Sequence, residues 1–116
     1  MVKPTILYTD FAALDMRVGT IIKAEEVEKS EKLVKFSLDL GKEIGERTIL
    51  SGIKKDFDWQ ALVGTQVLVL VNLESKVMMG LESQGMILMA VERGEQAEKI
   101  SLLVPQGKVP EGTGVM

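Results

Sequence analysis

Residues 33–63, LVKFSLDLGKEIGERTILSGIKKDFDWQALV, decide the predicted fold of this 116-residue chain. Apolar and polar side chains alternate over the first eight positions, which is the pattern of a half-buried β-strand. Its core face carries Val34, Phe36, Leu38 and Leu40, and its polar outer face carries Lys35, Ser37 and Asp39. We therefore expect residues 33–40 to belong to a sheet with one buried side.

The rest of this stretch predicts a hairpin followed by a short helix. Residues 41–46 are bounded by glycines and predict the connection, and 47–53 predict the returning strand. The pattern changes in 54–63, where Asp56 or Asp58 is positioned to cap a short helix. The inward side chains of this helix are expected to be Trp59, Leu62 and Val63, and Gly64 is expected to end it.

The flanking segments complete an order dominated by strands. One helical turn near the N-terminus, with Asp10 as its cap, precedes a long strand in which Gly19 is expected to form a bulge or bend. After the short helix we expect a fully buried strand, a loop, a fifth strand and a short sixth strand. These segments are 16–27 for the first strand, 66–73 for the buried strand, 74–84 for the loop, and 85–92 and 99–105 for the last two strands.

This order predicts an all-β OB-fold, a five-stranded Greek-key barrel with a short helix between strands three and four. A plain β-sandwich is the rival architecture, and the single helix after strand three favours the barrel. We expect one domain over residues 1–116, with a barrel core at about 14–92. Residues 93–116 are expected to form a C-terminal extension that is irregular but pinned down.

Composition excludes several classes of site. The chain has no cysteine and no histidine, which excludes disulfides, thiolate metal sites and Ser-His or Cys-His catalytic pairs. We expect no cofactor, no metal and no catalysis, because no calcium-loop or paired-acid motif is present either. The apolar runs are too short to span a membrane, and we see no signal peptide. A cytoplasmic binding or structural domain is expected, and the net charge of −3 argues weakly against a nucleic-acid partner.

An OB-fold usually binds ligands across strands two and three and the loops that flank them. Loop 28–32 and strand two bring Lys29, Lys32, Lys35 and Ser37 to that face, and strand three brings Arg47 and Ser51. Loop 74–84 and the residues after it bring Lys76, Met78, Met79, Ser83 and Met86. A basic rim with hydroxyl donors and soft apolar surface suits a phosphate backbone with exposed bases or sugars beside it.

Each of these residues also has a plainer interpretation. Lysines among glutamates, as in EVEKSEKL, usually mark a solvated turn, and methionines are usually core or interface filler. Ser51 and Ser83 can be turn formers that bond their own backbone, and Asn72 can be a turn residue at a strand end. Only their convergence on one predicted surface favours a binding site.

The segment DFAALDMRVGTIIKAEEVEKSEKLVKFSLDLG, residues 10–41, resembles the opening of the tRNA-binding domain family. The resemblance continues through RTILSGI, LVGTQVLVLVNL, MGLESQGMILMA and VPEGTGV, and covers nearly the whole chain. This domain is appended to many bacterial methionyl-tRNA synthetases and forms the separate beta subunit of some archaeal ones. It also occurs as free-standing tRNA-binding proteins and as an export-related chaperone.

The resemblance implies an OB-fold whose C-terminal extension mediates homodimerisation. It implies structure-selective binding of tRNA near the outside corner of the L, without catalysis, in a dimer that serves the catalytic subunit of methionyl-tRNA synthetase. The alternative that it leaves open is a chaperone-like peptide-binding dimer of the same fold. The binding residues that it implies are Lys32, Lys35, Ser51, Asn72, Ser83 and Met86, to which Lys76 adds one charge.

One segment departs from the pattern of the family. The family typically follows Asn-Leu with a proline and then a basic pair, whereas this chain has Ser75 in place of the proline and Val77 at the second basic position. Lys76 keeps one positive charge, which Glu74 partly cancels. We therefore expect weaker phosphate contact at this loop and more dependence on the lysines of the first loop and strand two.

Overall fold

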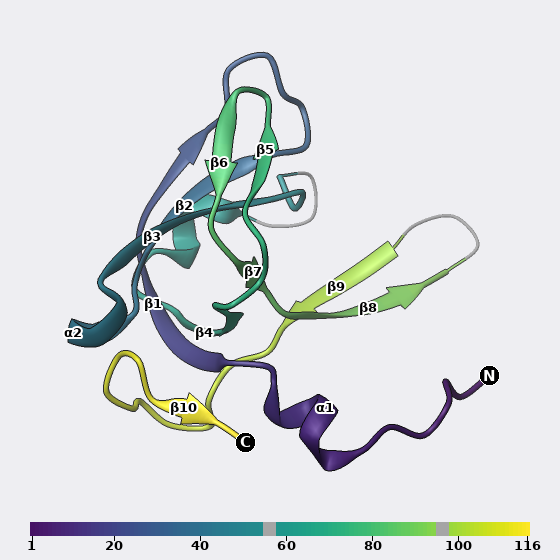
Figure 1. Cartoon of the computed structure of the whole chain (residues 1–116). Helices are drawn as coiled ribbons and strands as arrows, with labels where there is room; N and C mark the ends of the chain where they lie inside the picture. Colours follow the sequence, from purple (N-terminus) through teal and green to yellow (C-terminus); the bar gives the residue numbers. More distant parts are fainter. Residues whose placement is uncertain (55–57, 95–97) are drawn as a thin grey trace.

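The computed structural model describes residues 1–54, 58–94 and 98–116. Its main body is a nearly closed β-barrel of antiparallel strands, in which neighbours follow the order β3-β2-β1-β4-β7 (Figure 1). These strands are β1 Met16–Glu26, β2 Val34–Asp39, β3 Glu46–Ser51, β4 Gln66–Leu70 and β7 Met86–Ile87. The barrel and the order of its elements confirm the predicted all-β OB-fold.

The long strand β1 belongs to both halves of the barrel. Its first part pairs with β4, and from Thr20 onward it pairs with β2. The register with β2 shifts between Ile21 and Lys23, so the expectation of a bulge at Gly19 is wrong, and the alternative of a bend at Gly19 stays a prediction. Gly19 instead allows close packing, because a Cβ there would lie 2.7 Å from the Leu40 side chain.

One backbone bond and two side-chain oxygens close the gap between β3 and the chain that enters β7. The Gln84 backbone N–H donates to the Thr48 carbonyl at 2.8 Å, and the Thr48 N–H donates to the Gln84 side-chain oxygen at 3.1 Å. The Leu50 N–H donates to the Ser83 hydroxyl oxygen at 3.0 Å. These bonds satisfy backbone donors that would otherwise be an open edge of the sheet.

The core follows the alternation read from the sequence. The β2 side chains predicted to face inward are all buried, and they pack with apolar side chains of β1, β3, β4 and β7. The main buried residues are Ile21, Val34, Phe36, Leu38, Leu40, Ile49, Ile53, Val67, Val69 and Ile87. The outer face of β2 is less exposed than predicted, because Ser37 is buried as well.

A 3₁₀-helix, η1 Trp59–Leu62, lies between β3 and β4 as predicted. Trp59 and Leu62 pack against the core, but Val63 is 49% exposed, so its predicted inward position is wrong. Asp58 precedes the helix without a side-chain cap bond, and Asp56 lies outside the described residues. Gly64 adopts a φ of 93° at the end of the helix, which favours glycine.

Two further helical turns lie at the opposite end of the barrel from the β1–β2 loop. The β2–β3 connection contains α2 Gly41–Ile44, and α1 Tyr8–Ala12 precedes β1. Asp10 lies inside α1 rather than before it, and its carboxylate accepts the Leu7 N–H at 2.9 Å. No helix in the described part of the chain is long and apolar enough to cross a membrane.

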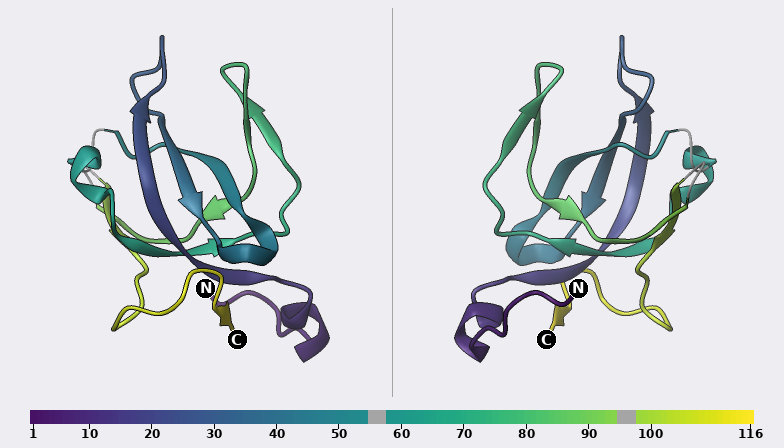
Figure 2. Two further views of the ribbon diagram at one scale, coloured as in Figure 1. Left: turned by 90° about the vertical axis from the view of Figure 1, so that its left-hand side faces the viewer. Right: turned by 90° about the vertical axis from the view of Figure 1, so that its right-hand side faces the viewer.

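The predicted loop 74–84 contains a hairpin of β5 Lys76–Met78 and β6 Leu81–Ser83. Both residues of its turn, Met79 and Gly80, have positive φ, as a tight hairpin turn requires. The predicted strand 85–92 is broken, because β7 is followed by β8 Met89–Arg93, which leaves the barrel. β8 pairs instead with β9 Glu98–Leu102 in a separate two-stranded ribbon (Figures 1 and 2).

The C-terminal tail is pinned to the barrel, as predicted. Its last strand, β10 Gly114–Val115, pairs with the start of β1. The Gly112 N–H donates to the Val18 carbonyl at 2.8 Å, and the Val18 N–H donates to the Thr113 carbonyl at 2.9 Å. The tail therefore extends the main sheet. The predicted boundary between the barrel core and the C-terminal extension, near residue 92, falls inside β8.

Candidate nucleic-acid interface

The two ends of the barrel differ in what they carry (Figure 2). The β1–β2 loop, residues 27–33, and the β5–β6 hairpin project from one end, and α1, α2 and the C-terminal tail gather at the other. A depression of about 510 Å³, which we call the groove, lies beside the hairpin. Its lining includes Leu33, Leu50, Ser51, Lys76, Met78 and Met86. This volume is within the range of small-molecule sites.

Three of the predicted lysines lie at or near the groove. Lys76 lines it, Lys32 directly precedes the lining residue Leu33, and Lys35 pairs in register with Leu50. Paired residues of antiparallel strands point to the same face, so the Lys35 side chain lies on the same face of the sheet as the lining residue Leu50. None of these lysines forms an ion pair with a described residue. Their charge is therefore available to a ligand.

Neighbouring charges of the same region are already paired. Lys54 lies 3.7 Å from Glu26 and also donates to the Ser30 carbonyl, and Lys23 lies 3.5 Å from Glu25. Within the part of the chain that the structure describes, no group of acidic side chains is placed to hold a metal ion. The groove thus has lysines but no metal site among its described residues.

The two predicted serines have different surroundings. Ser83 is buried, and its hydroxyl accepts the Leu50 N–H and donates to the Gly85 carbonyl at 3.5 Å. Ser51 pairs with Val34 and so lies on the core face of β3, where it lines the mouth of the groove. Its hydroxyl makes no hydrogen bond to a described residue. Ser83 thus builds the barrel, and Ser51 presents an unused polar group.

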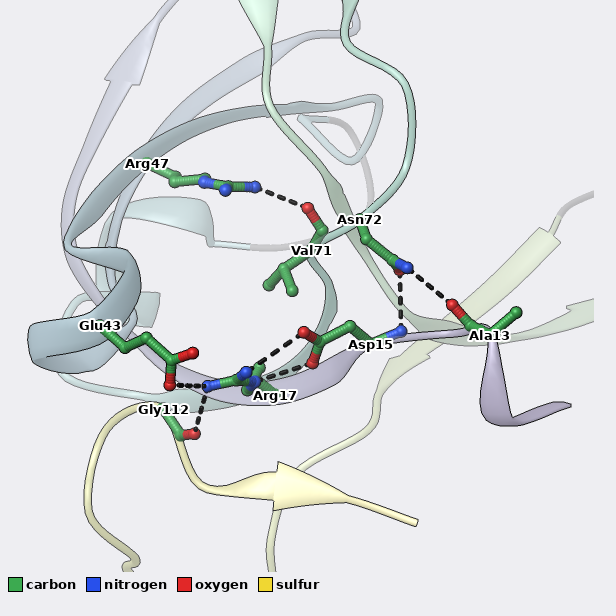
Figure 3. A network of polar contacts seen from close by, with 8 residues as sticks. All are labelled: Ala13, Asp15, Arg17, Glu43, Arg47, Val71, Asn72 and Gly112. Carbon is green, nitrogen blue, oxygen red and sulfur yellow. Dashed lines mark hydrogen bonds and ion pairs between the residues drawn. The ribbon is translucent and has the colours of Figure 1, made fainter. Parts of the chain in front are cut away.

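Arg47 does not lie on the predicted outer face of β3. It pairs with Leu38, so it shares the core face. Its guanidinium donates to the Val71 carbonyl at 2.6 Å (Figure 3) and also to the Gln84 carbonyl at 3.3 Å. The expectation that Arg47 belongs to the basic rim is wrong, because its pairing with Leu38 places it on the core face and its guanidinium bonds backbone carbonyls.

Asn72 joins the N-terminal segment to the end of β4. Its side-chain oxygen accepts the Asp15 N–H at 2.8 Å, and its amide group donates to the Ala13 carbonyl at 2.7 Å (Figure 3). The predicted contact of Asn72 with tRNA remains a prediction, and the structure gives the residue a tethering role.

The methionines of residues 76–89 divide by position. Met86 is 42% exposed and lines the groove, as does the partly buried Met78. Met79 is 54% exposed at the tip of the hairpin, and Met89 packs against the core while also lining the groove. Met78, Met86 and Met89 therefore supply adaptable apolar surface to the groove.

A polar cluster, which we call the latch, consists of Asp15, Arg17, Glu43 and the Gly112 carbonyl (Figure 3). Arg17 Nε donates to Asp15 at 2.7 Å, and Arg17 Nη1 donates to Glu43 at 3.1 Å and to the carbonyl at 3.5 Å. The hydrogen bond from Arg17 holds the pKa of Asp15 below its ordinary value. Both carboxylates in turn raise the pKa of Arg17, so the cluster stays charged.

Sequence reasoning did not find the latch. Arg17 and Gly112 are 95 residues apart, and no local pattern reports that α2 and the tail meet beside β1. A second link between distant residues joins Gln66 to Val109. The Val109 N–H donates to the Gln66 side-chain oxygen at 3.0 Å, and the Gln66 side-chain amide donates to the Val109 carbonyl at 2.7 Å. The alternation of polar and apolar residues identifies strands, but it does not identify which polar groups become partners.

The family model described as "Putative tRNA binding domain" matches residues 16–114. A methionine–tRNA ligase of Archaeoglobus fulgidus is 45% identical over 113 residues, which are 97% of this chain and 16% of the ligase. One of Flavobacterium psychrophilum is 52% identical over 87 residues, which are 75% of this chain and 12% of the ligase. The chain thus spans about a sixth or less of the length of these curated relatives.

Two solved structures match nearly the whole chain. A MetRS-related protein from Pyrococcus horikoshii is 33% identical with a TM-score of 0.86, and the match covers 98% of this chain and all of that one. The chaperone CsaA from Bacillus anthracis is 28% identical with a TM-score of 0.84, and the match covers 97% of this chain and all of that one. The barrel and its flanking ribbon therefore occur in proteins with two different descriptions.

Proposed function

The chain belongs to the tRNA-binding domain family, and from this we propose that it is a non-catalytic module that binds tRNA at the groove. The observation that carries the proposal is the set of lysines there, Lys32, Lys35 and Lys76, which have no ion pair with a described residue. Charge that is left unpaired beside exposed apolar surface favours phosphate with bases or sugars next to it. Ser51 and Met86 are proposed to contact the RNA beside these lysines.

The finer parts of the proposal concern the partner and the part of tRNA that is bound. The ligases that match this chain contain a similar segment, so we propose that the module serves a methionyl-tRNA synthetase in trans, in the cytoplasm. We also propose that it selects the outside corner of the tRNA L. In a competition assay against bound tRNA, a full-length tRNA should then displace more of it than an equal-mass mixture of its isolated arms. Equal displacement by the two competitors would contradict the selection of the corner.

A salt titration tests tRNA binding. Neutralising about three phosphates predicts that affinity falls with salt with a log–log slope of roughly −2 to −3, at −0.7 to −0.9 per contact. The Lys32→Glu/Lys35→Glu double variant should lose most of the affinity, and Lys42→Glu, an exposed change on α2 at the other end of the barrel, should keep it. Binding that is absent at low salt, or insensitive to salt, would contradict the proposal.

A chaperone-like peptide binder is the second candidate function. The apolar lining of the groove and the similarity to a CsaA chaperone favour it. Methionine-rich surfaces adapt to varied apolar partners, whereas lysines matter most for phosphate. The same double lysine variant separates the two functions, because it should abolish tRNA binding and leave the binding of an apolar peptide intact.

We further propose that the chain forms a homodimer through its C-terminal extension. The support is apolar exposure on the ribbon and the segment that follows it, where Val91, Leu103 and Val104 are 44%, 40% and 56% exposed. Deleting the extension would also remove β10 from the barrel, so point changes are the better test. Leu103→Lys/Val104→Lys should halve the mass in light scattering, and a wild-type protein of monomeric mass would contradict the dimer.

A further inference from the structure

The two sides of the groove differ in chemistry. The β1–β2 loop and β2 contribute Lys32 and Lys35, which have no ion pair with a described residue. The opposite side, residues 73–86, contains one lysine and two glutamates and so has a net charge of −1. It is instead apolar at its surface, since Leu73, Val77 and Met86 are 47%, 69% and 42% exposed. The first side, residues 27–39, has three lysines and three acidic residues and so a net charge of 0, but its Lys32 and Lys35 offer unpaired ammonium groups to an anion, whereas the second side offers apolar surface.

A ligand that matches both sides has anions along one edge and flat apolar groups along the other. Single-stranded RNA has this arrangement, because its unstacked bases are exposed beside a charged backbone. Duplex RNA does not match it, since pairing and stacking hide the faces of the bases. The asymmetry of the groove thus favours single-stranded RNA over duplex RNA.

The lining of the groove can hold one flat apolar group of the size of a nucleobase. Leu33, Leu50, Met78 and Met86 contribute apolar side chains to this lining. The Ser51 hydroxyl lines the same space and is not bonded to a described residue, whereas the Ser83 hydroxyl is fully used by the barrel. An unused hydroxyl within apolar walls can bond the edge of a base whose faces contact methionine.

We propose that the groove takes an unpaired nucleobase of the bound RNA. Its faces lie against Met78 and Met86, its polar edge reaches the Ser51 hydroxyl, and its phosphates lie toward Lys32 and Lys35. This inference rests on the proposed binding of tRNA and deepens it, because it assigns an occupant to the apolar space and a single-stranded loop nucleotide to the contact.

The test compares RNA strands of equal charge with and without bases. Fluorescence anisotropy would measure binding of a ten-nucleotide single strand and of the same strand with abasic riboses at its central positions. The intact strand should bind about tenfold more tightly, within the range for stacking of a base on a protein side chain. Met86→Ser should weaken binding of the intact strand and leave binding of the abasic strand unchanged, so the ratio of the two affinities should fall about three- to tenfold. A 2-aminopurine at the central position should change its fluorescence on binding.

The matched control is Leu14→Ser, which changes an apolar residue of similar exposure, 45%, before β1 at the opposite end of the barrel. It should leave both affinities unchanged. Equal binding of the intact and abasic strands, or an equal loss with both after Met86→Ser, would overturn the base pocket. So would an apolar peptide that fills the groove without weakening RNA binding. If tRNA and both strands fail to bind at low salt, the proposed function itself fails, which is a distinct result.

Discussion

The groove and the latch occupy opposite ends of one barrel and use their polar side chains in opposite ways. At the latch, Arg17 bonds two carboxylates and a backbone carbonyl, and the nearby Asn72 uses both ends of its amide. At the groove, three lysines and the Ser51 hydroxyl have no ion pair or hydrogen bond to a described side chain. The paired groups of the latch hold the fold together, and we propose that the unpaired groups of the groove contact a ligand.

The two ends also differ in how closely their backbone segments pack. Two glycines meet where the C-terminal tail packs against the β2–β3 connection. A Cβ on Gly112 would lie 2.5 Å from the Leu40 carbonyl oxygen, and one on Gly41 would lie 2.5 Å from the Glu111 carbonyl oxygen. At the groove, Met86 and Val77 are exposed instead. Changes at the latch should therefore affect stability, and changes at the groove should affect binding.

The largest predicted effect comes from Gly112→Ala. Gly112 has a φ of +87°, and the new Cβ meets backbone that cannot rotate away, so the free energy of unfolding should fall by about 2–4 kcal/mol. Urea denaturation measures it. Gly114→Ala is the matched control, because nothing lies within 4 Å of its Cβ position. Where the variant is still folded, its affinity for RNA should equal that of the wild type, and a matching loss of affinity would break the separation of the two ends.

Arg17→Met should have the next largest effect. It removes a guanidinium that is 19% exposed and leaves Asp15, Glu43 and the Gly112 carbonyl without their donor, so we expect a loss of about 1–3 kcal/mol. Lys42→Met, on α2 at the same end of the molecule, is exposed and should change stability by less than about 0.5 kcal/mol. Equal thermal unfolding of the two variants would show that the latch contributes nothing.

Local sequence patterns predict some of these structural features and not others. The alternation in β2 is local, so the positions of Val34, Phe36 and Leu38 in the core could be read directly. The direction of Arg47 could not, because it depends on pairing with Leu38 and not on its own neighbours. The hairpin turn at Met79 was also missed, since its positive φ occurs without the Asn-Gly or Asp-Gly signal of such turns. Register and distant partners are set by the whole fold.

The candidate site divides in the same way. Strand order and the usual binding face of an OB-fold predict Lys32, Lys35 and Lys76 near one surface. In the structure Lys76 lines the groove, Lys32 precedes the lining residue Leu33, and Lys35 pairs with the lining residue Leu50. The environments of the serines required the structure, because only the closure of β3 against Ser83 shows which hydroxyl is used. Composition reports which groups are present, and packing decides which of them are left unpaired.

Asn72→Ala should have a moderate effect that sharpens the comparison. It removes two hydrogen bonds between the end of β4 and the N-terminal segment, so we expect a loss of about 1 kcal/mol and easier proteolysis before residue 14. Gln106→Ala is a suitable control, because Gln106 is an exposed amide with no hydrogen bond to a described residue. A loss of RNA affinity with unchanged stability would instead assign Asn72 to the groove.

The smallest predicted effect is the acid sensitivity that Asp15 contributes. Because its pKa in the folded protein is lowered by the hydrogen bond from Arg17, this stabilisation is present above the ordinary carboxyl pKa and is lost as pH falls through the lowered one. Asp15→Asn should therefore be less stable than the wild type at pH 7, by at most about 1 kcal/mol because the side chain is 42% exposed. The difference should shrink toward zero as pH falls below 4, and added salt should reduce it at pH 7. Urea midpoints at several pH values measure both trends. A difference in stability between the wild type and Asp15→Asn that stays constant from pH 7 into the acid range would mean that Asp15 acts through hydrogen-bond geometry and not through its charge.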